Sequence, residues 1–132
     1  MRKLYLIACV FCYFLSYAQS PEKMSYQAVI RNASNEIVSN ASVGMQISIL
    51  QGNSTGTAVY TETHAPVTNQ NGLISIEIGS GSVISGDLST IDWSSNTYFI
   101  KTETDPDGGT KYTIIATSQL LSVPYALHAK TA

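Results

Sequence analysis

Catalysis would require a base, and the chain offers two histidines, His64 and His128. Nucleophilic hydrolysis needs a base, a hydroxyl and an orienting group that converge in one pocket. His64 ends a strand-like segment and precedes Ala65 and Pro66, a position typical of a surface residue. We therefore expect no catalytic residue. An enzyme would need His64 within hydrogen-bond reach of a serine and a carboxylate.

Carboxylates are the next candidates, because glycoside hydrolysis uses two of them roughly 5–10 Å apart. Glu62, Glu77 and Glu103 all lie in strand-like segments. Alternation along these segments places the three side chains on outward faces. We interpret them as ordinary surface charges.

An acidic stretch at residues 105–108, Asp-Pro-Asp-Gly, resembles the start of a calcium loop. An EF-hand also needs an oxygen ligand at its fifth position and a Glu at its twelfth, where this chain has Gly109 and Ala116. Turn chemistry explains the stretch better. The two histidines lie too far apart in the sequence for a zinc motif, and no nucleotide-binding glycine pattern is present. We expect neither a metal nor a cofactor.

Aromatic residues could form a stacking surface for sugars or a patch for a protein partner, since such rings combine apolar area with a polar tip. Aromatics are also favoured in half-buried strands, so core packing is the preferred interpretation. The residues that we consider as contacts with a partner or ligand are Tyr60, His64, Trp93, Tyr98 and Tyr125.

The balance of charge excludes one class of partner. Charged residues make up 12% of the 132 residues, with seven Lys and Arg against nine Asp and Glu. No strongly basic surface can hold a phosphate backbone, so we expect no nucleic-acid partner.

The N-terminus has the three regions of a secretory signal peptide. Two basic residues precede the apolar run 4–15, and Ser16 and Ala18 supply small residues for cleavage. The run is shorter than the about 20 residues that a transmembrane helix needs. We predict that residues 1–18 are removed and that the mature chain begins at Gln19.

This signal predicts an exported protein in the extracellular space or on the outer cell surface, with no membrane span after cleavage. The alternative is a lipoprotein anchored through Cys9, which follows Leu-Ile-Ala. Cleavage after Ala18 would remove Cys9 and Cys12, the two cysteines of the chain. An apolar core must then stabilise the mature protein without disulfides.

Short segments with a period of two make up most of the mature chain, and turn residues separate them. The predicted strands are Ser25–Arg31, Ser42–Leu50, Thr57–His64, Leu73–Ile78, Thr97–Thr104, Thr110–Thr117 and Gln119–Val123. In Ser42–Leu50, apolar residues at 43, 45, 47 and 49 predict one core face and one solvated face. Residues 79–86 are rich in glycine and serine and predict a loop.

These strands predict an all-β fold, an antiparallel two-sheet sandwich of immunoglobulin-like or transthyretin-like character. The sandwich domain is expected over residues 22–124. Leu88, Ile91 and Trp93 lie in an irregular connection and are expected to plug its open end. Residues 125–132 are expected to form a short helix-prone tail or the start of a downstream element.

Several sequence segments resemble the N-terminal module of secreted Bacteroidota surface proteins, in which tail-fibre-like, collagen-like or self-cleaving chaperone segments follow. The resemblance covers most of residues 22–132. The segments that carry it are Ser25–Asn32, Ile49–Gly52, Val59–His64, Asn71–Leu73, Ile78–Gly81, Ile91–Trp93 and Ser118–Lys130. It implies an exported module without assigned enzymatic activity, which serves as the base or connector of an elongated surface protein.

We therefore expect a non-catalytic module with a structural or adhesive role at the cell surface. Its partner would be a protein or a polysaccharide, and a homo-oligomer stays open. Exposed strand edges offer a physical basis for such contacts, because their unpaired backbone groups can bind an extended segment. The alternative is a carbohydrate-binding module that uses exposed aromatic rings.

Overall fold

The computed structural model describes residues 23–120 and contains seven strands and one short helix. The elements are β1 (Met24–Val29), β2 (Gly44–Gln51), β3 (Thr57–His64), β4 (Leu73–Ile78), β5 (Ser82–Gly86), the 3₁₀ helix η1 (Leu88–Thr90), β6 (Tyr98–Asp105) and β7 (Ile114–Leu120). Every strand pairing is antiparallel. The predicted all-β fold is confirmed. The predicted signal peptide and the 125–132 tail lie outside the described residues.

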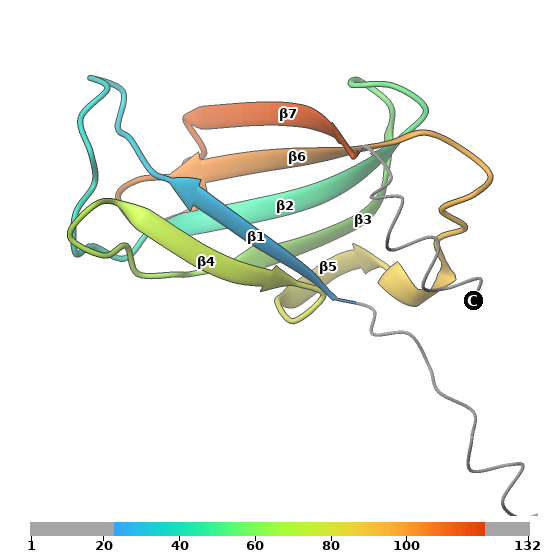
Figure 1. Ribbon diagram of the computed structural model, residues 1–132, viewed down its shortest axis with the longest axis horizontal. Coiled ribbons are helices and arrows are strands. Elements are labelled where there is room, and N and C mark those ends of the chain that lie inside the picture. The colour runs from blue at the N-terminus through green and yellow to red at the C-terminus, as the bar shows by residue number, and fades with distance from the viewer. Residues whose placement is uncertain (1–22, 121–132) are drawn as a thin grey trace, which may run out of the picture.

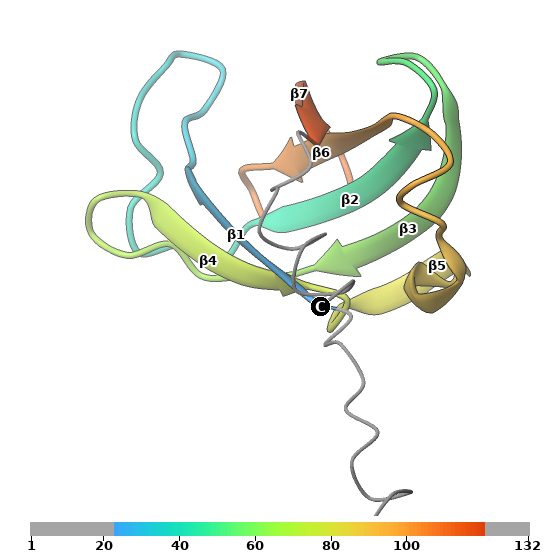
Figure 2. The same cartoon turned by 45° about the vertical axis from the view of Figure 1, so that its right-hand side comes forward.

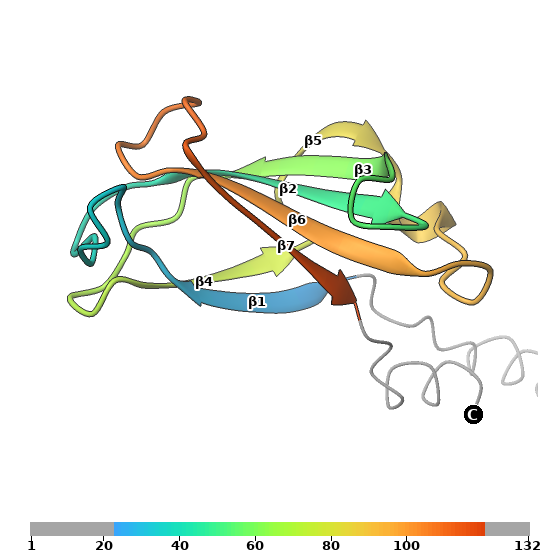
Figure 3. The ribbon, with the colours of Figure 1, turned by 90° about the horizontal axis from the view of Figure 1, so that it is seen from above.

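The strands form two layers. The larger sheet has the order β5-β3-β2-β6-β7, and β1 pairs with β4 in a separate two-stranded sheet. Figure 1 shows β1 and β4 in front of the larger sheet, and Figure 2 shows the larger sheet curving beside them. Seen from above, the two sheets form the layers of a sandwich (Figure 3). The terminal strands β1 and β7 therefore belong to different layers.

The core lies between the two layers and follows the predicted alternation. The inner residues Met45, Ile47 and Ile49 of β2, and Val43 just before it, are at most 1% exposed, and Ile74, Ile76 and Ile78 of β4 face them across the core. Each such side chain contributes about 1.5–3 kcal/mol through burial. The outer face of β2 is less solvated than predicted, since Ser48 is buried and its hydroxyl meets that of Thr61 on β3.

Two strand predictions are corrected. Residues 82–86 form the edge strand β5 and not a loop, because backbone pairing with β3 holds a segment whose side chains are all exposed. The segments predicted at residues 110–117 and 119–123 are not separated at residue 118, because residues 114–120 form the single strand β7, which pairs with β6 without a register shift. Residues 121–123 lie outside the described residues. The bounds of β3 and β4 agree with the prediction.

The connection between β5 and β6 closes one end of the sandwich, as predicted. Leu88 is buried, and Ile91 and Trp93 pack against the core. Trp93 meets Tyr98 edge to face, with ring centroids 5.0 Å apart. Asp87 and Asp92 each begin a turn in which the carboxylate accepts hydrogen bonds from a serine two residues later.

Asp105 organises the turn between β6 and β7. Its carboxylate accepts backbone N–H groups of Asp107 at 2.9 Å, Gly109 at 2.9 Å and Lys111 at 3.0 Å. The predicted turn is confirmed, and Gly108 has the positive φ of 89° that such a turn requires of glycine. The turn lies against Gly44, where an added Cβ would meet the carbonyl oxygen of Gly109 at 1.9 Å.

The hydrogen bonds from Asp107, Lys111 and Gly109 lower the pKa of Asp105 below its ordinary value of 3.8, although burial opposes them. A lowered pKa in the folded state means that the unfolded chain binds protons first as the pH falls. The stabilisation is therefore fully present well above pH 3.8 and is lost as the pH falls through the folded-state pKa.

We predict that Asp105→Asn lowers the melting temperature at neutral pH, because an amide nitrogen replaces one acceptor of the turn. The difference from wild type should shrink as the pH falls below the pKa of the folded state. Thermal unfolding followed by circular dichroism over a pH series measures both effects. Asp107→Asn, at an exposed position of the same turn, is the matched control. A difference that stays constant down to the lowest pH would contradict the prediction.

Candidate functional site

Glu62 lies on an inner face, and the outward position predicted from the sequence is wrong. Its residue is 0% exposed, and it stands opposite Ile47 of β2 on the inner face of the larger sheet. The reason is the period of two in β3. The ring of Tyr60 is 2% exposed and belongs to the core, so Glu62 and His64 follow on the same face.

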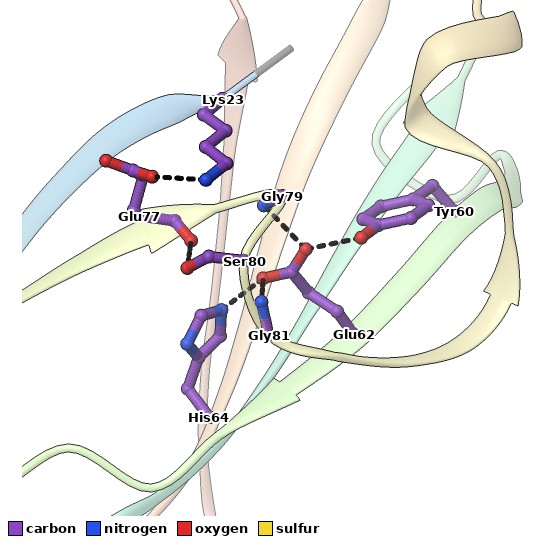
Figure 4. A network of polar contacts seen from close by, with 8 residues as sticks. All are labelled: Lys23, Tyr60, Glu62, His64, Glu77, Gly79, Ser80 and Gly81. Carbon is purple, nitrogen blue, oxygen red and sulfur yellow. Dashed lines mark hydrogen bonds and ion pairs between the residues drawn. The ribbon is translucent and has the colours of Figure 1, made fainter.

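Four partners surround the Glu62 carboxylate (Figure 4). Its Oε1 accepts the Tyr60 hydroxyl at 2.5 Å and the backbone N–H of Gly79 at 2.7 Å. Its Oε2 accepts the backbone N–H of Gly81 at 3.2 Å and contacts Nε2 of His64. Both oxygens therefore have two partners each, and a buried carboxylate requires such partners.

The β4–β5 turn approaches this carboxylate closely because two of its residues are glycines. Gly79 has a φ of 109°, which disfavours any side chain. At Gly81, a Cβ would lie 2.6 Å from Oε2 of Glu62, Nε2 of His64 and the carbonyl oxygen of Thr63. Glycine at both positions lets backbone N–H groups reach a side chain of another strand.

Within the network, the Tyr60 hydroxyl is the donor and the Glu62 carboxylate is the acceptor. Burial first, and then the hydrogen bond and charge of Glu62, raise the pKa of the Tyr60 hydroxyl. A raised pKa keeps the hydroxyl protonated, so it remains a donor to the carboxylate at all physiological pH values.

His64 contacts a carboxylate, as a catalytic base would, but the hydroxyl of the nearby Ser80 is bonded elsewhere. The His64 side chain is 11% exposed and pairs with Glu62. Ser80 lies nearby (Figure 4), yet its hydroxyl donates to the carbonyl oxygen of Glu77 at 2.7 Å. Within residues 23–120, no serine hydroxyl is hydrogen-bonded to His64. The arrangement can anchor a loop, but it lacks the contacts of a serine triad.

Residues 52–56 read Gly-Asn-Ser-Thr-Gly, which matches the letters of a nucleophile elbow. A true elbow joins a strand to a helix. This segment instead joins the antiparallel strands β2 and β3 as a hairpin turn. The structural context of a nucleophile elbow is therefore missing.

The other proposed contact residues are inside or partly inside the sandwich. Tyr98 is 5% exposed, and its hydroxyl donates to the carbonyl oxygen of Asp92 at 2.9 Å. Trp93 is half-buried against it. Tyr125 lies outside the described residues. Every aromatic ring between residues 23 and 120 is buried or half-buried.

The two remaining strand carboxylates face outward. Glu77 is exposed and pairs with Lys23 at 3.3 Å, whereas Glu103 is half-buried and accepts a hydrogen bond from Gln46 at 3.0 Å. In the part of the chain that the structure describes, no group of three or more His, Cys, Asp or Glu side chains could hold a metal ion. The same residues include no helix with the length and hydropathy to cross a membrane.

The chain matches one protein family over most of the described residues. A family model described as Domain of unknown function (DUF8740) matches residues 25–118. The match covers all but the first residue of β1, then β2 to β6, and most of β7. No curated protein and no solved structure matches the chain.

We predict that Glu62→Gln lowers the free energy of unfolding by about 2–3 kcal/mol. The amide nitrogen would replace one carboxylate oxygen and would then face N–H or O–H donors, from which it cannot accept a hydrogen bond. Urea denaturation measures the change. Glu77→Gln, in an exposed ion pair, is the matched control and should change stability by less than about 0.5 kcal/mol. Equal effects of the two substitutions would show that the buried contacts add nothing.

Proposed function

We propose that this chain, which belongs to the DUF8740 family, is an exported, non-catalytic β-sandwich module with a structural or adhesive role at the cell surface. Its resemblance to the N-terminal modules of Bacteroidota surface proteins supports this proposal. In such a role it would serve as the base or connector of an elongated surface protein and would bind a protein partner.

The observation that carries the proposal is the open edge at β7. Residues 115–119 of this strand are exposed at every position, on both faces. The strand contains no charged residue and no proline. Proteins commonly protect a sheet edge with charges, prolines or bulges. An edge without these features is suited to accept an extended segment from a partner.

Among residues 23–120, the layer opposite the larger sheet leaves the middle of β7 uncovered. On β6, the inner residues Ile100 and Thr102 are buried at 5% and 6% exposure. Their cross-strand neighbours on β7, Ser118 and Ala116, face the same side and are exposed. The inner face of β7 is therefore also accessible to a partner.

The buried polar network also supports a structural role. The Glu62 carboxylate is hydrogen-bonded to Tyr60, His64 and the β4–β5 turn. These contacts join parts of the scaffold to one another. The burial of the aromatic rings favours this role over the carbohydrate-binding alternative, which requires exposed rings.

We predict that the full chain is exported with its N-terminus at Gln19. N-terminal sequencing and mass spectrometry of material from the producing bacterium measure this directly. Retention in the cytoplasm with an intact signal would contradict the proposal. Fatty acid on Cys9 would replace a free exported protein with an anchored one.

We predict that Ser118→Lys lowers retention at the cell surface at least about fivefold, because a charge at a sheet edge opposes strand addition. Surface fractionation of tagged full chain measures retention. Ser75→Lys, at an exposed position of β4 away from β7, is the matched control and should leave retention unchanged. Unchanged retention in both variants would remove the edge as the binding element. Binding to a polysaccharide that Trp93→Ala abolishes would favour the alternative.

A further inference from the structure

We propose that the occupant of the β7 edge is a second copy of this chain. In this dimer, the two β7 strands pair antiparallel about a two-fold axis at Thr117 and join the two larger sheets into one continuous sheet. The inference rests on the proposed structural role, for which it names the partner and the contact.

The sequence of β7 is self-complementary in this register. With Thr117 opposite Thr117 of the other copy, Ile114 stands opposite Leu120 and Ala116 stands opposite Ser118. Directly opposite residues of antiparallel strands lie on the same face. Ile114 and Leu120 both lie on the inner face, where they are only half-buried within one chain. On the inner face, the register therefore pairs apolar with apolar and small with small residues, whereas on the outer face Ile115 stands opposite Gln119.

Charge also favours pairing of β7 with itself. Like charges directly opposite one another destabilise a strand pair. A two-fold axis between two strands places the residue on the axis opposite its own copy and that residue's neighbours close by. Residues 114–120 are Ile, Ile, Ala, Thr, Ser, Gln and Leu. Their self-pairing brings no like charges together and leaves no charged group to be desolvated.

The other free edges are less suited to this contact. The strand β5 at the opposite end of the sheet has a register shift against β3 between Thr61 and Glu62, and its last residue, Gly86, has a φ of 80°. Such irregularities twist an edge away from further pairing. In the smaller sheet, β4 contains Glu77 and Lys23 directly precedes β1. By contrast, β7 is regular over seven residues.

A charge-swap experiment tests the pairing. Purified wild-type mature chain, residues 19–132, should show a concentration-dependent dimer in analytical ultracentrifugation. Thr117→Lys and Thr117→Glu should each weaken the dimer at least about fivefold, because like charges then face each other across the axis. An equimolar mixture of the two variants should restore it. Ser75→Lys, mixed with Ser75→Glu, is the control and should change nothing.

Cross-linking tests the register, and it is direct because residues 19–132 contain no cysteine. Under mild oxidation, Thr117→Cys should form a disulfide-linked dimer, whereas Ser75→Cys should not. A mixture of Ile114→Cys and Leu120→Cys should give mainly the mixed dimer. Mainly like-with-like products from that mixture would overturn the antiparallel register.

A strictly monomeric wild type at all accessible concentrations would overturn the dimer. That result would point to another occupant, such as residues 121–132 of the same chain or a different protein. The proposed function stands or falls on separate readouts, export and surface retention. If the chain is a monomer but is exported, and Ser118→Lys lowers its surface retention, the dimer is wrong and the proposed function is kept.

Discussion

The chain passes from one layer of the sandwich to the other between β4 and β5, and the Glu62 carboxylate secures this passage. A buried charge costs several kcal/mol unless hydrogen bonds compensate for it. Here the compensation comes from Tyr60 and His64 of the same strand and from the two glycine N–H groups of the crossing turn. This polar contact within an apolar interior fixes the turn that leads into β5 and so helps to place β5 beside β3.

The sequence predicted the fold well where local alternation and tertiary burial agree. The inner face of β2 and the bounds of β3 and β4 follow from a period of two. The strand β5 escaped prediction because backbone pairing with a neighbour holds it, and its two apolar residues, Val83 and Ile84, are adjacent and so give no alternation. Two of the four partners of Glu62 escaped prediction for a related reason, since they are backbone N–H groups of Gly79 and Gly81, distant in sequence. One signal was available: the ring of Tyr60 must enter the core, and Glu62 shares its face.

The two outer strands of the larger sheet differ in how they end it. At the β5 side, a register shift and the anchored turn complete the sheet within the chain. At the β7 side, the ladder is regular, and Ala116 and Ser118 on the inner face are exposed. The polar network and the open edge thus lie on opposite sides of the sheet. A contact along β7 can therefore form without disturbing the network that holds the layers together.

The placement of β1 and β7 in different layers determines how tension would pass through the module. A pulling force on the N-terminal side enters through β1, whose strand partner is β4. From this smaller sheet the force reaches the larger sheet through the apolar core and through three chain connections, β1 to β2, β3 to β4 and β4 to β5. Resistance to such a force therefore depends on the core between the layers as well as on the β1–β4 ladder, and the Glu62 carboxylate anchors one of the three connections.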